Sequence, residues 1–92
     1  MRDIDAIIAT LISCSPRVVV QQLRVVHPGA DDDGLWFFTH PESKFEVQLE
    51  APTGCCPFLF ETSENATRLT AYSTSEAVSL VLSGLGIVNR VA

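Results

Sequence analysis

Apolar residues recur at helical spacing near both ends of the chain. The first group forms one face of a helix and comprises Ile4, Ile7, Ile8, Leu11 and Ile12. The second group has the same spacing and comprises Val78, Val81, Leu82 and Leu85. The pattern therefore predicts one amphipathic helix over residues 4–13 and another that begins just after Ser73.

Short local signals predict where these helices begin and end. Pro16 cannot continue the first helix and restricts the residue before it, so we expect that helix to end there. Ser73 and Glu76 have the spacing of a capping box, in which each side chain accepts a hydrogen bond from the other residue's backbone N–H. Gly84 and Gly86 are both candidate stops for the second helix.

The segment between the two helices predicts five strands. The clearest is residues 44–50, where Phe45, Val47 and Leu49 alternate with polar residues, as in a strand with one buried face. Valine and aromatic residues bounded by turn residues predict the remaining strands at 17–27, 35–38, 58–61 and 67–72.

Short turns between consecutive strands favour an antiparallel meander, and both apolar helix faces need a sheet to cover them. We therefore predict an α+β fold with the order α-β-β-β-β-β-α. It is a two-layer sandwich of a five-stranded antiparallel meander sheet with N-terminal and C-terminal helices. At 92 residues the chain has room for a single core, so residues 1–92 are expected to form a single domain.

The second predicted strand is apolar on both faces. If Leu35 and Phe37 face the helices, then Trp36 and Phe38 face away, or the reverse. A large exposed aromatic patch usually marks an interaction surface, so we predict that Trp36 and Phe38 contact a partner. Two alternatives stay open: one helix covers each face of the sheet, or the sheet curls over itself. A symmetric homodimer is the commonest use of such a surface.

The charge balance narrows the class of partner. The net charge is −5, from 11 acidic and 6 basic residues, and the basic residues are scattered along the chain. Binding to nucleic acid or to an anionic membrane requires clustered cations, so neither partner is expected. A basic protein suits this chain better, and Asp31, Asp32 and Asp33 are predicted to form an acidic rim beside Trp36.

The chain shows no sign of export. Asp3 and Asp5 precede any apolar stretch, unlike a secretory signal, and unbroken apolar runs are four residues or fewer. We therefore expect a cytoplasmic protein whose three cysteines are reduced thiols.

Candidate chemistry centres on Cys55 and Cys56. No basic residue within several positions could activate either thiol, and no cysteine or histidine spacing matches a zinc site. The run Asp31–Asp33 lacks the alternating acids of a calcium loop, and no phosphate-binding or dinucleotide motif is present. We therefore predict no metal, no cofactor and no catalytic residue.

Size, acidity and element order resemble those of small bacterial proteins that neutralise toxins or chaperone secreted proteins. The likeness is to a general type, without a shared motif, and secretion chaperones have an extra helix between their strands. The leading hypothesis is a non-catalytic protein-binding domain, homodimeric, acting through its acidic and aromatic surface. The alternatives are a small thiol- or metal-dependent enzyme centred on Cys55 and Cys56 and, last, a small-molecule binder.

Overall fold

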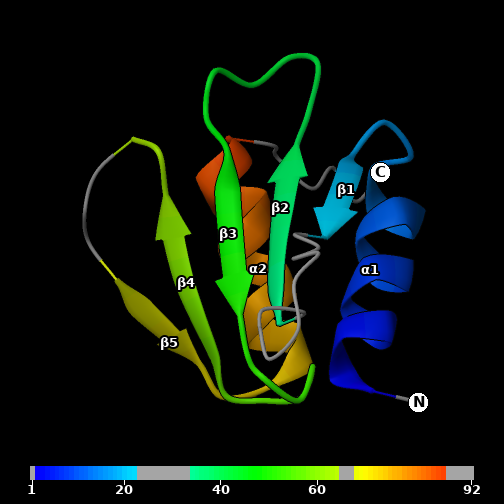
Figure 1. Ribbon diagram of the computed structural model, residues 1–92. Coiled ribbons are helices and arrows are strands. Elements are labelled where there is room, and N and C mark those ends of the chain that lie inside the picture. Colours follow the sequence, from blue (N-terminus) through cyan, green and yellow to red (C-terminus); the bar gives the residue numbers. More distant parts are fainter. Residues whose placement is uncertain (1, 23–33, 65–67, 87–92) are drawn as a thin grey trace, which may run out of the picture.

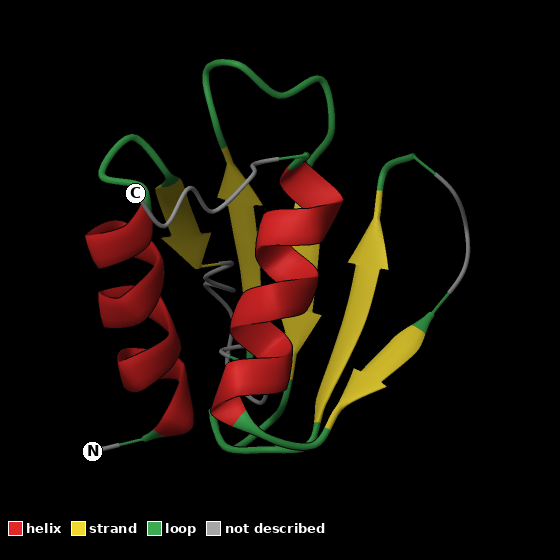
Figure 2. Ribbon diagram, turned by 180° about the vertical axis from the view of Figure 1, so that it is seen from behind, coloured by secondary structure: helices red, strands yellow, loops and turns green. Residues whose placement is uncertain are grey.

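The computed structural model describes residues 2–22, 34–64 and 68–86. Their elements are, in order, α1 (Asp3–Cys14), β1 (Val19–Gln22), β2 (Leu35–Thr39), β3 (Val47–Glu50), β4 (Phe58–Thr62), β5 (Leu69–Ala71) and α2 (Thr74–Leu85). The strands form one antiparallel sheet in the order β1-β2-β3-β4-β5. Both helices lie on the same side of this sheet, behind it in Figure 1 and in front of it in Figure 2. The predicted α+β sandwich and its element order are confirmed.

The ends of α2 follow the predicted capping only in part. The Ser73 hydroxyl accepts a hydrogen bond from the Glu76 backbone N–H at 3.1 Å, which satisfies one unpaired donor of the first turn. The Glu76 carboxylate accepts instead from the N–H of Tyr72 at 2.8 Å, one residue before the position that a capping box predicts. Gly86 ends the helix in a left-handed conformation, with φ 71°. Gly84 lies inside the helix, so its prediction as a stop is wrong.

The core fills the space between the helices and the sheet. Helix α2 packs against β3, β4 and β5, and it also packs against α1. The largest fully buried side chains come from both layers and are Ile4, Ile7, Leu11, Phe38, Val47, Leu49, Phe58 and Val81. Both predicted helix faces therefore supply core residues.

Several strands are shorter than their sequence patterns predict. Strand β1 covers only the first part of the expected strand at 17–27, because residues 23–33 lie outside the described segments. Strand β3 begins at Val47, which leaves Phe45 before the strand and half-buried. Val47 and Leu49 are fully buried, as their alternation with polar residues predicts.

Candidate functional site

Trp36 and Phe38 lie in the core and not on the surface. They are 3% and 0% exposed, respectively. In the strand register Trp36 lies opposite Leu49 and Phe38 opposite Val47, and both of those residues face the helices. The expectation that the two aromatic residues form an exposed patch is therefore wrong, because the structure buries both beneath the chain's own helices.

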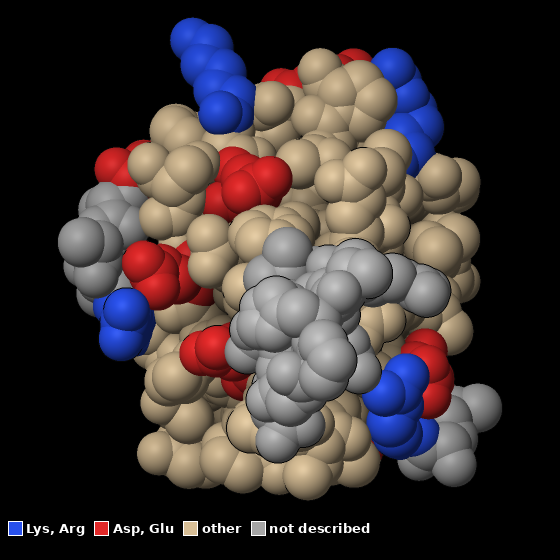
Figure 3. All heavy atoms as spheres, viewed as in Figure 1, with Lys and Arg blue, Asp and Glu red and all other residues tan. Residues whose placement is uncertain are grey.

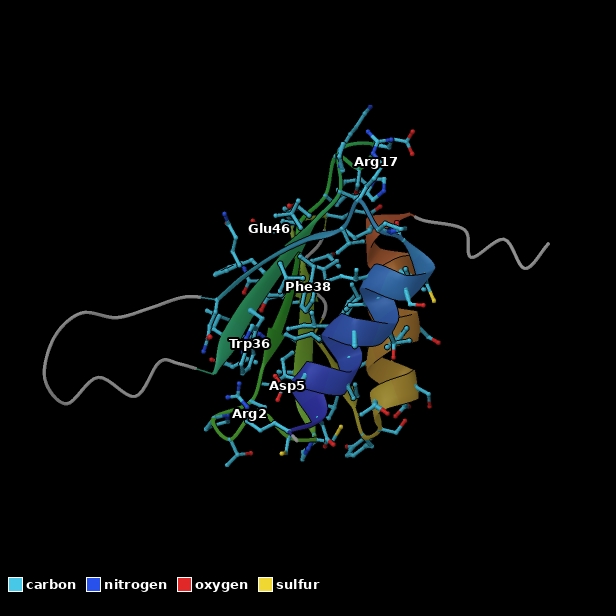
Figure 4. All side chains as sticks on the ribbon, turned by 90° about the vertical axis from the view of Figure 1, so that its right-hand side faces the viewer. Arg2, Asp5, Arg17, Trp36, Phe38 and Glu46 are labelled. Carbon is cyan, nitrogen blue, oxygen red and sulfur yellow. The ribbon has the colours of Figure 1, made fainter. Side chains whose placement is uncertain are left out.

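The side chain of Trp36 lies near the beginning of α1 and contacts Phe58 and Arg2. Its ring contacts that of Phe58 edge to face, with centroids 6.4 Å apart and an interplanar angle of 66°. The guanidinium carbon of Arg2 lies 6.0 Å from the centre of the Trp36 ring, within the range of a cation–π contact. Arg2 also forms an ion pair with Asp5 at 3.5 Å, and the two lie together at the beginning of α1 in Figure 4. These contacts and its burial give Trp36 a role in stabilising the fold.

The predicted acidic rim, Asp31, Asp32 and Asp33, lies outside the described residues. The structure therefore brings together two of the five residues predicted to bind a partner, Trp36 and Phe38, and it places both in the core.

The side of the sheet turned away from the helices is the open face. It carries the positions that alternate with the buried ones in β2, β3 and β4, and the more exposed positions of β1. Val19 and Leu59 on this face are 48% and 42% exposed, and Leu35 and Phe37 are half-buried. Of the two arrangements that the sequence allowed for β2, the structure shows the one in which Leu35 and Phe37 face away from the helices.

The strand register mixes apolar and polar side chains across the open face. One row of cross-strand neighbours runs through Gln21, Phe37, Gln48 and Glu61. The adjacent row runs through Leu35, Glu50, Leu59 and Thr70. The second row sets Leu35 and Leu59 on either side of the Glu50 carboxylate, and in the first row Gln48 lies between Phe37 and Glu61. The open face therefore combines apolar and charged side chains, as many protein interfaces do.

The carboxylates of the open face lie mainly over β3 and β4, where Figure 3 shows red side chains on the side facing the viewer. Glu61 forms an ion pair with Arg68 at 3.2 Å. Glu46, labelled in Figure 4 on the side of the sheet away from the helices, forms no ion pair with any described residue, and neither does Glu50. The open face therefore retains uncompensated negative charge.

Cys55 and Cys56 lie in the loop between β3 and β4, against the start of α1. The backbone N–H of Cys56 donates to the Asp3 carboxylate at 2.9 Å, and the N–H of Ile4 donates to the carbonyl of Gly54 at 2.9 Å. Burial and the nearby Asp3 carboxylate, in that order, raise the pKa of the Cys56 thiol. A nucleophilic thiol needs a lowered pKa, so this environment works against catalysis by Cys56.

The contact with Asp3 could not be found from the sequence. Asp3 precedes Cys56 by 53 residues. From the sequence, Asp3 indicates only that an acidic residue lies near the beginning of the first helix. No group of three or more His, Cys, Asp or Glu side chains in residues 2–22, 34–64 and 68–86 could hold a metal ion.

A shallow groove lies on the helix side, between α2 and the β4–β5 edge. Its volume is about 240 Å³, and its lining residues are Phe60, Thr62, Glu64, Leu69, Leu80, Ser83 and Gly84. Small-molecule sites usually occupy roughly 300–1,000 Å³ and enclose most of the ligand. The groove therefore falls below the usual size of a small-molecule site.

Comparisons with protein-family models, with curated proteins and with solved structures find no match to this chain. Among the described segments, neither helix has the length and apolar character needed to cross a membrane.

Proposed function

We propose that this chain is a non-catalytic protein-binding domain whose open face docks onto a basic protein partner. The observation that carries the proposal is the one-sided packing of the helices, which leaves Val19 and Leu59 exposed on the opposite side of the sheet. Val19 and Leu59 lie three strands apart, and the half-buried Leu35 and Phe37 of β2 lie on the same face between them, which makes the apolar surface broader than single exposed residues would.

Charge indicates the chemistry of the partner. Glu46 and Glu50 on the open face form no ion pair with a described residue, and the whole chain carries a net charge of −5. A partner with lysine or arginine around an apolar centre would match both features, and long-range attraction would speed its approach. Proteins that neutralise toxins or chaperone secreted proteins act in this general way, by covering a surface of another protein.

We also place this activity in the cytoplasm. Cys14, Cys55 and Cys56 are all free thiols. Reduced thiols persist in that compartment, because thioredoxin and glutathione oppose the formation of disulfides there.

The test is capture of the partner by the tagged chain from a lysate of its host, at low and at high salt. The informative variant is Leu59→Lys, which places a cation on the open face, opposite Glu50 in the strand register. Ile12→Lys is the matched control, because Ile12 on α1 is 44% exposed and Leu59 is 42% exposed. Both changes add the same charge at an apolar position of nearly equal exposure.

The proposal expects a partner that binds the wild type and Ile12→Lys, binds Leu59→Lys at least about tenfold more weakly, and dissociates at high salt. Equal binding by the two variants would show that the partner uses another surface. The absence of any partner at either salt concentration would overturn the proposal.

A further inference from the structure

One carboxylate of the open face lies between two leucines. Glu50 is exposed, and in the strand register it lies opposite Leu35 of β2 on one side and opposite Leu59 of β4 on the other. Cross-strand neighbours on one face of a sheet have Cβ atoms about 4.5–5.5 Å apart, so the three side chains lie close together. Within residues 2–22, 34–64 and 68–86, no cation forms an ion pair with Glu50.

Glu46 carries the same charge on the same face, but its neighbours are polar (Figure 4). Continuing the register of β3 by one residue sets Glu46 between Thr39 of β2 and Ser63, which follows β4. The Ser63 hydroxyl accepts a hydrogen bond from the backbone N–H of Glu46 at 2.8 Å, and the N–H of Ser63 donates to the carbonyl of Glu46 at 2.9 Å. The two glutamates therefore differ in the polarity of their surroundings.

These surroundings determine what a docked partner does to each carboxylate. A surface that covers Leu35 and Leu59 must also exclude water from Glu50, which lies between them. A carboxylate removed from water is strongly unfavourable unless it gains a hydrogen-bonded cation. The partner must therefore supply a cation directly to Glu50, whereas Glu46 can keep its water among polar neighbours at the rim of the contact.

The chain's own arginines do not supply this cation. Every arginine among the described residues is paired with a different carboxylate, in the pairs Arg2–Asp5, Arg17–Glu42 and Arg68–Glu61. Glu50 is thus available to a cation from outside the chain.

We propose that Glu50 binds an arginine side chain of the partner, with Leu35 and Leu59 flanking the contact. This inference rests on the proposed docking function and specifies its chemistry. The guanidinium group donates two parallel hydrogen bonds to a carboxylate, and it is more weakly hydrated than an ammonium group, so it loses less on entering a space between apolar side chains. The aliphatic part of the arginine side chain also covers apolar surface. Glu50 is therefore the position at which this face distinguishes arginine from lysine.

The test is an NMR titration of the full chain with N-acetyl-arginine amide and, separately, with N-acetyl-lysine amide, at constant ionic strength. Both probes carry a single positive charge. We expect the arginine probe to shift the methyl resonances of Leu35 and Leu59 and the side-chain carboxyl resonance of Glu50. The lysine probe should bind at the same place about threefold or more weakly, because its ammonium group is more strongly hydrated and cannot form the paired hydrogen bonds.

Glu50→Gln and Glu46→Gln form a matched pair of variants. Each removes one carboxylate that has no ion pair with a described residue, and each changes the net charge from −5 to −4, so long-range attraction for the probe falls equally. Glu50→Gln should weaken binding of the arginine probe about threefold or more, as expected for an exposed ion pair, and Glu46→Gln should weaken it less than about twofold. Circular dichroism should show the same fold for both variants.

The same two variants apply to the partner captured by the wild type. The Glu50 contact is then covered by the partner, so Glu50→Gln should weaken binding about tenfold or more, and Glu46→Gln should have the smaller effect.

Three results of the titration would overturn the proposal: an arginine probe that leaves Leu35 and Leu59 unmoved, equal binding of the two probes, or equal effects of the two variants. These failures differ from a failure of the docking function, because the titration needs no partner. A partner that Leu59→Lys releases and Glu50→Gln does not would refute the arginine contact alone. The absence of any captured partner would overturn the docking function.

Discussion

Gly84→Ala tests how closely α2 approaches the sheet. Alanine in place of glycine within a helix ordinarily stabilises a protein by about 1 kcal/mol. Here the added Cβ would lie 2.7 Å from Cγ2 of Val47 and 3.0 Å from both Cζ of Phe60 and Cγ2 of Thr62. Real Cβ atoms essentially never lie closer than 3.0 Å to such neighbours, so α2 or the sheet must shift.

The neighbouring side chains have little room to move. Val47 is fully buried and Phe60 is 6% exposed, and both belong to the core beneath α2. Inserting a methyl group into a well-packed core typically costs about 1–3 kcal/mol. Because Gly84 lies in the last turn, the gain in helix propensity should be less than 1 kcal/mol. The net expectation is a loss of about 1–2 kcal/mol in the free energy of unfolding.

Urea denaturation of the wild type and Gly84→Ala measures this loss, and a drop of about 4–16 °C in melting temperature should accompany it. Ser83→Ala is the control, because Ser83 is the preceding residue of α2 and is exposed to solvent. It gains helix propensity without a clash and should be slightly stabilising. The reasoning is refuted if Gly84→Ala proves as stable as Ser83→Ala.

Two further changes test local contacts. Ser73→Ala removes the hydroxyl that accepts from the N–H of Glu76, so the free energy of unfolding in urea should fall by about 1 kcal/mol; an unchanged value would contradict the cap. The folded protein raises the pKa of Cys56 above its ordinary value of 9.0, through burial first and Asp3 second. The protonated thiol's contribution to stability is therefore complete below pH 9 and is lost as the pH rises through the folded pKa. Between pH 8 and pH 10 the wild type should lose more stability than Cys56→Ala, and parallel curves would contradict this.

The element order was predictable because local patterns agree with the fold. The alternation of Val47 and Leu49 with polar residues identifies both a strand and its buried face. Spacing of apolar residues predicts both helices, and the Ser73 cap marks where α2 begins.

The buried face of β2 could not be predicted in the same way. All of the residues from Leu35 to Phe38 are apolar, so alternation cannot distinguish the two faces. The outcome depends on the register of β2 against β3, which sets Trp36 opposite Leu49. That register depends on contacts between strands and not on the sequence of β2 alone. It places Trp36 and Phe38 in the core, so the candidate surface is the opposite face of the sheet.

The environment of Cys56 and the role of Gly84 could not be predicted either, because both depend on how distant elements pack together. The Asp3 carboxylate reaches Cys56 only because α1 packs beside the β3–β4 loop. Gly84 appears in the sequence as a helix stop, whereas its missing side chain allows α2 to lie close to Val47 and Phe60. Neither relation leaves a local signal in the chain.

Methyl NMR of the chain, titrated with the partner captured by the wild type, tests the central claim most directly. If the open face is the docking surface, the methyl resonances of Val19, Leu35 and Leu59 should shift, while those of Leu80 and Leu85 on α2 stay in place. Shifts confined to the leucines of α2, with Leu59 unmoved, would contradict the account and place the partner on the helical side.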